Sequence, residues 1–231
     1  MLTGSDWELT TLRYSAALFD LDGTLIDSGQ DIVESVRRAL GQVFSDRSLP
    51  EAAEVLALVG QPLETVVRQL GYPADAESTR RFAETYRAHY AEHYNDSTKV
   101  YPGIEELLAG LQQAGVKLGL VTTKHQQQAE FTLAGTGLTG YFDYIHGWLE
   151  GRKHKPDPEP VLTTLRQLAV SPGSAIMVGD SELDIEAAKA AGVETCAVTY
   201  GFRPAWFLKS LHPDFLVARV ADIGPIVVSQ E

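Results

Sequence analysis

Short apolar runs that alternate with helical patterns are the feature that most restricts the fold of this chain. Apolar residues recur at helical spacing in several segments, for example at Ile104, Leu107, Leu108 and Leu111. Strands that alternate with helices predict right-handed crossovers and a parallel α/β sheet. The runs predicted to be buried strands are Ala16–Leu21, Val116–Thr123, Tyr144–Gly147, Ala175–Asp180, Thr195–Thr199 and Phe215–Ala218.

The alternation stops between Ser28 and about Lys99, where every strong apolar pattern is helical. We interpret this interval as an all-helical cap domain, residues 28–98, inserted into a Rossmann-like α/β core domain formed by residues 1–27 and 99–231. Ligands of open α/β sheets bind beyond the carboxyl ends of the strands, so an insertion after the first strand is expected to act as a lid. Its expected hinges lie near Asp27–Gly29 and Asp96–Tyr101.

Charge restricts the possible partners. The chain holds 31 Asp and Glu against 19 Lys and Arg, a formal net charge of −12. Nucleic acids and anionic membranes are bound through basic surfaces, so neither is an expected partner. An anionic substrate would need a local positive site, such as a metal ion, a lysine or a helix N-terminus.

The location and the assembly of the chain are weaker expectations. No apolar run is long enough to span a bilayer, and the first residues lack the basic and apolar segments of a secretory signal, so we expect a cytoplasmic protein. The single cysteine, Cys196, excludes an internal disulfide and is predicted to be a buried strand residue. Residues 1–13 are expected to be poorly ordered, and the protein is expected to be a monomer or a homodimer.

Two acids close the first predicted strand. The segment FDLDGTLIDS places Asp20 and Asp22 one residue apart, so strand alternation would put both carboxylates on one face. A strand end followed by an Asp-Gly turn, with acids that only solvate a loop, is the structural alternative.

The letters DLDGT resemble the signature of the haloacid dehalogenase-like superfamily, most of whose members transfer phosphoryl groups. The other three family motifs follow in order, as Thr122 after the second strand, Lys155 in KPDPEP, and Asp180 with Asp184 in GDSELD. Taken singly, each has a structural explanation, as a strand end, a solvated loop lysine or a helix N-cap. Because all of them follow strands of one sheet, they together predict a site.

The resemblance implies a role for each motif residue. Asp20 would be the nucleophile that forms an aspartyl-phosphate, and Lys155 would keep it ionised and offset charge on the phosphoryl group. Thr122 would donate its hydroxyl to a phosphate oxygen. Asp22 would protonate the leaving group and then take a proton from the attacking water.

A magnesium site is implied by the same motifs. Carboxylates of Asp20 and Asp180, with the backbone carbonyl of Asp22, form a credible partial shell for Mg²⁺, which prefers oxygen ligands. Asp184, one helical turn after Asp180, would orient water on the metal.

The resemblance also narrows the substrate. Family members that cleave carbon–halogen bonds generally lack the second aspartate, so Asp22 favours a phosphate ester or anhydride. The helical insertion resembles the cap of the phosphoglycolate phosphatase-like group, and VTTKH with KPDPEPV is most similar to its pyrophosphate-hydrolysing relatives. We therefore expect a small anionic substrate, phosphoglycolate or pyrophosphate, contacted by Gln61, Lys124, Thr123 and Gly23.

Two other functions stay open at this point. A phosphomutase of the β-phosphoglucomutase type would pass the phosphoryl group to a second sugar hydroxyl, and analysis of the products separates it from a phosphatase. A binding module that kept the fold and lost turnover would release no phosphate in the presence of Mg²⁺.

Overall fold

The computed structural model describes residues 11–229 and divides into two compact units. The sheet unit is formed by Met1–Ile26 and Val100–Glu231, and the helical unit by Asp27–Lys99. We expected poor order for residues 1–13, and residues 1–10 of this range lie outside the described residues. Thr11–Leu12 form strand β1.

The main sheet of the sheet unit has six strands in the order β6-β5-β2-β7-β8-β9, and every neighbouring pair is parallel. They are the six predicted strands, with ends that differ by at most a few residues. Their bounds are β2 Ala16–Phe19, β5 Lys117–His125, β6 Tyr144–Trp148, β7 Ala175–Gly179, β8 Glu194–Val198 and β9 Phe215–Val217. The predicted parallel α/β fold is confirmed.

The strand order makes β2 the centre of the sheet. From β2 the chain adds β5 and β6 on one side and then returns to add β7, β8 and β9 on the other. Such a reversal leaves a crevice at the carboxyl end of the central strand, which is where ligands bind in open α/β sheets. Asp20 is the residue that follows β2 at this point.

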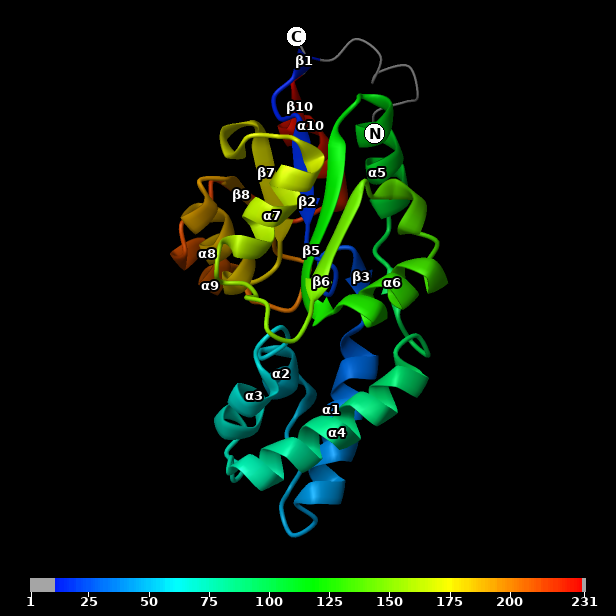
Figure 1. The fold of residues 1–231 in the computed structure, drawn as a ribbon, viewed down its shortest axis with the longest axis vertical. Helices are drawn as coiled ribbons and strands as arrows, with labels where there is room; N and C mark the ends of the chain where they lie inside the picture. Colours follow the sequence, from blue (N-terminus) through cyan, green and yellow to red (C-terminus); the bar gives the residue numbers. More distant parts are fainter. Residues whose placement is uncertain (1–10, 230–231) are drawn as a thin grey trace. The chain divides into compact units, whose positions relative to one another are not determined.

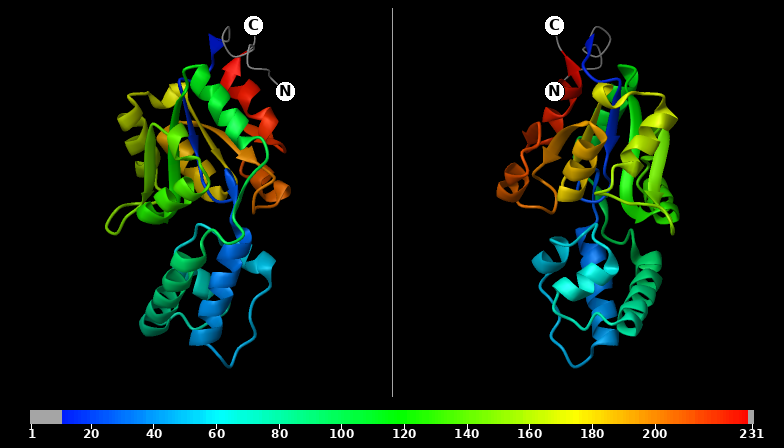
Figure 2. Two further views of the ribbon diagram at one scale, coloured as in Figure 1. Left: turned by 90° about the vertical axis from the view of Figure 1, so that its right-hand side faces the viewer. Right: turned by 60° about the vertical axis from the view of Figure 1, so that its left-hand side comes forward.

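Helices cover both faces of the sheet (Figures 1 and 2). Alternate residues of β2 face opposite layers, because Ala17 and Phe19 pack in one buried cluster and Ala16 and Leu18 in another. The first cluster includes apolar residues of α5, Ile104–Gln113, and α6, Gln126–Gly135. The second includes residues of α7, Glu159–Leu168, and α8, Glu182–Ala191.

Several short elements were not predicted. β1 pairs antiparallel with β10, Val228–Ser229, and β3, Ile26–Asp27, pairs with β4, Lys99–Val100. The short helices α9 and α10 are Ala205–Ser210 and Gly224–Val227, and three 3₁₀ turns complete the unit at Thr139–Tyr141, Pro172–Ser174 and Val220–Asp222. Segments of two to six residues are too short to show a hydrophobic period.

Four helices form the helical unit, and their apolar faces make its core. Their bounds are α1 Gly29–Val43, α2 Ala52–Leu56, α3 Leu63–Gln69 and α4 Ala76–His93. Leu40 of α1, Val67 of α3 and Phe82 and Tyr90 of α4 are almost completely buried in one cluster. α2 gave no sequence pattern because Val55 is its one buried residue. The role of this unit as a lid stays a prediction.

Two other sequence predictions concern single segments. Cys196 lies in β8 and is 1% exposed, and burial raises the pKa of its thiol to about 12, as expected of a strand residue that takes no part in chemistry. Within residues 11–229, no helix combines the length and the apolar character needed to cross a membrane.

Candidate active site

A tight turn after β2 holds the first two acids. The backbone N–H of Asp20 donates to the carbonyl of Val178 on β7 at 3.0 Å, which extends the β2–β7 pairing by one residue. The chain then turns back, because the N–H groups of Leu25 and Ile26 both donate to the carbonyl of Leu21. Asp20 and Asp22 are each 8% exposed. The turn thus buries two carboxylates at the carboxyl end of the central strand.

Lys155 reaches this edge from the loop between β6 and α7. Its ammonium donates to Asp20 Oδ1 at 2.8 Å, to Asp184 Oδ1 at 2.5 Å and to the carbonyl of Val121 at 2.7 Å. An ammonium has three N–H donors, so the side chain is fully bonded although it is only 2% exposed. Lys155 is therefore fixed beside the nucleophile that the sequence predicted.

Asp180 follows β7, and close backbone approach shapes the space around it. The N–H of Phe202 donates to Asp180 Oδ2 at 2.6 Å. Gly23 has φ +84°, and a Cβ there would lie 2.3 Å from Asp180 Oδ2, while a Cβ at Gly201 would lie 2.4 Å from the same oxygen. Both positions require glycine if Asp180 is to keep its place.

Asp184 has both a structural and an electrostatic role. Its Oδ2 accepts from the N–H of Ser181 at 3.1 Å and from the Ser181 hydroxyl at 2.6 Å, which completes a capping box at the start of α8. Its Oδ1 accepts from Lys155, and the residue is 1% exposed. The helix-cap explanation of GDSELD is therefore correct, and the same cap holds an acid against Lys155.

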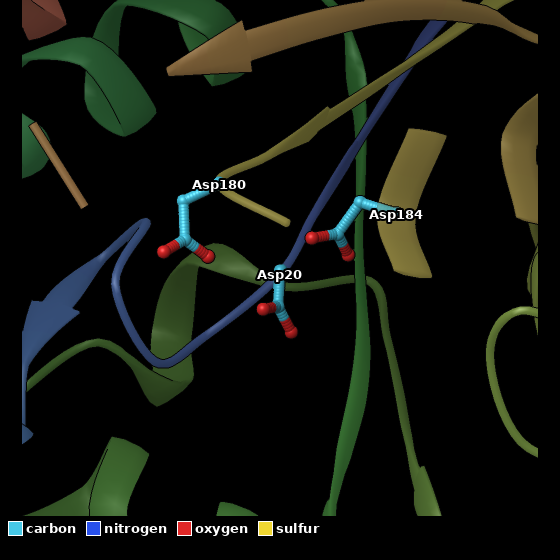
Figure 3. Close-up of side chains that lie close together, drawn as sticks. All are labelled: Asp20, Asp180 and Asp184. Carbon is cyan, nitrogen blue, oxygen red and sulfur yellow. The ribbon is translucent and has the colours of Figure 1, made fainter. Parts of the chain in front are cut away.

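Three of these acids form a cluster. Asp20, Asp180 and Asp184 each offer a carboxylate oxygen, and these oxygens lie within 4.8 Å of one another. Figure 3 shows the three side chains close together, and they come from the end of β2, the end of β7 and the first turn of α8. A buried, all-oxygen donor set of this kind fits a hard divalent cation.

Burial sets the protonation of the cluster. It raises the pKa of Asp20 from 3.8 to about 7, and the charges of Asp184 and Asp22 add to the rise while Lys155 opposes it. Burial also raises the pKa of Asp180 well above its ordinary value, and the charges of Asp184 and Asp20 add to the rise. For Lys155, burial lowers the pKa but the two bonded carboxylates outweigh it, so the net shift is upward. Ionising both Asp20 and Asp180 therefore requires more positive charge than Lys155 supplies.

The remaining predicted site residues fall into three groups. Thr122 is 4% exposed near the end of β5, and its hydroxyl oxygen accepts from the N–H of Lys124 at 3.1 Å. Lys124 Nζ lies 3.0 Å from Asp22 Oδ1. Thr123, which lies between Thr122 and Lys124 in the sequence, is partly exposed. Gln61 belongs to the helical unit, and its contact with a substrate stays a prediction.

Some functional contacts were missed by the sequence reasoning. The segment after β8 supplies the Phe202 N–H to Asp180, and the adjacent Arg203 is 4% exposed with its Nε 2.9 Å from Glu182 Oε2. Gly201, directly before them, was the available signal, since a glycine after a buried strand indicates close backbone approach. The Val121 carbonyl that accepts from Lys155 could not be identified from the sequence, because every residue has a backbone carbonyl.

This combination of fold and acidic edge matches a known family. Residues 17–198 match the model of the haloacid dehalogenase-like hydrolases, and the chain belongs to that family. The family prediction is therefore confirmed.

Individual relatives agree with this assignment. The chain is 34% identical to pyrophosphatase PpaX of Bacillus velezensis, over 93% of this chain and 97% of that protein. It is 35% identical to phosphoglycolate phosphatase of Aquifex aeolicus, over 89% and 93% of the two chains. A crystal structure of a predicted phosphatase from Clostridium acetobutylicum superposes with a TM-score of 0.84 at 30% identity, covering 94% of this chain and 99% of that one. The prediction of an enzyme of the phosphatase class is confirmed.

Proposed function

We propose that this protein is a Mg²⁺-dependent phosphatase that hydrolyses a small phosphorylated metabolite of the cytoplasm through an aspartyl-phosphate on Asp20. Phosphoglycolate and pyrophosphate are the favoured substrates, in line with the names of the two relatives. The observation that carries the proposal is the bond of 2.8 Å from Lys155 to Asp20 inside a buried cluster of three carboxylates. A carboxylate nucleophile needs this kind of local cation, because its substrate is also an anion.

The first half of the reaction forms the phospho-enzyme. A carboxylate oxygen of Asp20 attacks phosphorus, the bond from phosphorus to the leaving oxygen breaks, and Asp22 gives its proton to that oxygen. Lys155 stays beside Asp20 and offsets charge on the phosphoryl oxygens. The Thr122 hydroxyl is proposed to donate to one of those oxygens, and the turn at Gly23 and the backbone near Thr123 to contact the others.

The second half restores the enzyme. Asp22 now takes a proton from water, whose oxygen attacks the aspartyl-phosphate, and the bond from phosphorus to Asp20 breaks to release inorganic phosphate. Carboxylates of Asp20 and Asp180, the Asp22 carbonyl and Asp184 are the groups proposed to hold Mg²⁺. When bound, the ion would neutralise charge shared by the nucleophile and the phosphoryl group.

A substrate screen with two matched aspartate variants tests this proposal. Purified protein is assayed for phosphate release from phosphoglycolate, pyrophosphate, sugar phosphates and nucleotides, with Mg²⁺ and with EDTA. Asp20→Asn should abolish turnover, while Asp222→Asn should keep it, because Asp222 pairs with Arg219 on the surface. Full activity in Asp20→Asn would show that the mechanism is wrong, and transfer of phosphate to a sugar instead of water would identify a mutase.

A further inference from the structure

Two histidines lie one turn apart on α4 in the helical unit. The rings of His89 and His93 are stacked, with their centroids 4.3 Å apart and their planes at 27°. Neither residue is fully buried, and the side chain of His93 is 44% exposed. Residues four apart share one face of a helix, so both imidazoles reach the same side of α4. The proposed function makes no use of this pair.

Hydrogen bonds fix which nitrogen of each ring carries the proton. The Ser35 hydroxyl donates its one hydrogen to the carbonyl of Asp31 at 2.8 Å, so its oxygen accepts from Nδ1 of His89 at 3.0 Å. Nδ1 of His93 lies 2.7 Å from Oδ2 of Asp96, and an ionised carboxylate can only accept. Both Nδ1 atoms are therefore donors. In the neutral rings the lone pair is then on Nε2.

The two Nε2 atoms are the polar atoms of the rings that remain. Among residues 11–229, neither Nε2 has a hydrogen-bond partner. Histidines that bind a metal commonly have this arrangement, with one nitrogen on the ion and the N–H of the other held by an oxygen acceptor. On α4 the acceptors are a hydroxyl and a carboxylate. Both rings are thus held in the tautomer that a metal ion requires.

The charges near the pair also favour a cation. Glu34 of α1 and Glu92 of α4 act on His89 and favour positive charge there. Arg38 of α1 and the second histidine, when protonated, oppose it. Asp96 adds a further negative charge beside the second ring. In this part of the helical unit, three acids therefore face one arginine.

We propose that His89 and His93 form a binding site for a late transition-metal ion such as Zn²⁺, coordinated by their two Nε2 atoms, with water completing its shell. Imidazole suits zinc, copper and nickel, whereas Mg²⁺ prefers oxygen. The site is therefore chemically different from the acidic cluster of Asp20, Asp180 and Asp184. It goes beyond the proposed function and does not depend on it.

A metal ion at this position would connect separate segments of the helical unit. Ser35 belongs to α1 and accepts from His89 on α4, and Asp96 lies in the turn that follows α4. Fixing both rings on one ion holds these segments together, and an ion bound only by the native state stabilises that state. Zinc should therefore raise the thermal transition of wild type more than that of a variant that lacks either histidine.

Zinc calorimetry with histidine variants tests the site. The titration is done in excess Mg²⁺, and zinc that displaces Mg²⁺ from the acidic cluster is seen equally in every variant. His89→Gln and His93→Gln should each weaken zinc binding to α4 by about 10²-fold or more, because the second bond of a chelate is intramolecular. His212→Asn is the matched control and should bind zinc as wild type does. His212 is an exposed histidine of the sheet unit, and asparagine tolerates its φ of +50°.

Electron paramagnetic resonance of bound Cu²⁺ gives a readout that the acidic cluster does not produce. Imidazole nitrogens split the Cu²⁺ signal, whereas carboxylate oxygens do not. Wild type with one equivalent of Cu²⁺ should show the splitting of two nitrogens, and His89→Gln and His93→Gln should lose it. Asp96→Ala removes the acceptor of the His93 Nδ1, so it should weaken Cu²⁺ binding by about 10-fold and keep the splitting.

Two results would overturn the inference. One is a zinc affinity and a copper signal that are the same in wild type and in both histidine variants. The other is a wild type that binds ions through oxygen alone, with no nitrogen splitting. If His89→Gln does not fold, as judged by circular dichroism, the more exposed His93→Gln decides between these outcomes. Neither result bears on phosphate release, so the proposed function is tested separately.

Discussion

The exposed ion pairs of the helical unit contrast with the buried ion pairs that the sheet unit holds beside exposed ones such as Arg219–Asp222. In the helical unit, Arg80 pairs with glutamates one turn away along α4, and its side chain is 56% exposed. In the sheet unit, Lys155 is 2% exposed and pairs with Asp20 and Asp184, which are 135 and 29 residues away in sequence. The pairs of Arg80 form within a single helix, whereas the buried group exists only once several strands have assembled.

This contrast indicates what each arrangement is for. Exposed pairs add little to stability, and buried charges must overcome a large desolvation cost that apolar residues would avoid. The helical unit has an apolar core, its ion pairs through Arg80 lie on the surface, and its buried acid Asp31 accepts hydrogen bonds from the backbone N–H groups of Ser97 and Thr98. The sheet unit places acids and lysines where they oppose folding, and such groups are expected at sites of chemistry.

Lys155→Met should have the largest effect. The change removes all three bonds of the ammonium and leaves Asp20 and Asp184 facing each other without it. Turnover should fall by about 10³-fold or more, because the cation beside the proposed nucleophile is lost. The free energy of unfolding should fall by about 3–5 kcal/mol, as in other buried pairs that lose one partner. Steady-state kinetics and urea unfolding measure the two effects, and a stable, active variant would show that the buried group is not what sets this unit apart.

Gly23→Ala in the sheet unit should weaken Mg²⁺ binding, whereas the matched change Gly71→Ala in the helical unit should not. Gly23 and Gly71 both have positive φ, +84° and +80°, so alanine at either costs about 1–2 kcal/mol of stability. A Cβ at Gly23 would also lie 2.3 Å from Asp180 Oδ2, whereas at Gly71 nothing lies within 4 Å. Gly23→Ala should therefore weaken Mg²⁺ binding by about 10–100-fold while Gly71→Ala leaves it unchanged. A Mg²⁺ titration of activity compares the two, and equal constants would contradict the expectation.

The stability of the metal-free protein should depend on pH through the sheet unit. Because burial raises the pKa of Asp20 from 3.8 to about 7, the native state between these values holds a proton that the unfolded state has lost. The free energy of unfolding should therefore decrease as the pH rises through that range, and Mg²⁺ should restore it most at the upper end. Urea midpoints in EDTA from pH 4.5 to 8 test this, with Asp20→Asn expected to give a flatter profile. A steeper decrease in Asp20→Asn than in wild type would contradict the assignment.

Arg80→Met should have the smallest effect. Its partners Glu77 and Glu84 are 65% and 58% exposed, so water replaces the lost contacts. We expect an almost unchanged urea midpoint and unchanged turnover. A loss comparable to that of Lys155→Met would mean that exposure does not explain the difference between the two sets of ion pairs.

Much of the fold could be predicted because its signals are local. The four inner strands β2, β5, β7 and β8 are mostly buried on both faces and appear as continuous apolar runs, such as Ala175–Gly179, whereas the edge strands β6 and β9 are only partly buried. The amphipathic helices α5, α7 and α8 showed their period directly. α6 did not, because Gln126–Gly135 has few apolar residues and buries little of its surface.

The candidate site was partly predictable for a different reason. Carboxyl ends of parallel strands meet at one edge, so acids that follow β2 and β7 were expected to meet, and Asp20 and Asp180 do lie together. The pairing of Lys124 with Asp22 was not predicted, since no pattern of residues indicates which acid a strand-end lysine will reach. Backbone donors such as the Phe202 N–H could not be predicted, because their positions depend on the packing of distant loops.

The pairing of β3 with β4 has a consequence for how this chain could change. Ile26–Asp27 and Lys99–Val100 are paired strands. The polypeptide therefore leaves the sheet unit and returns to it at adjacent positions. Closing a segment between neighbouring ends costs little more entropy when the segment grows. Recombination could therefore exchange the whole interval for one of another length or architecture, and substrate range could diversify while the phosphoryl-transfer machinery is inherited intact.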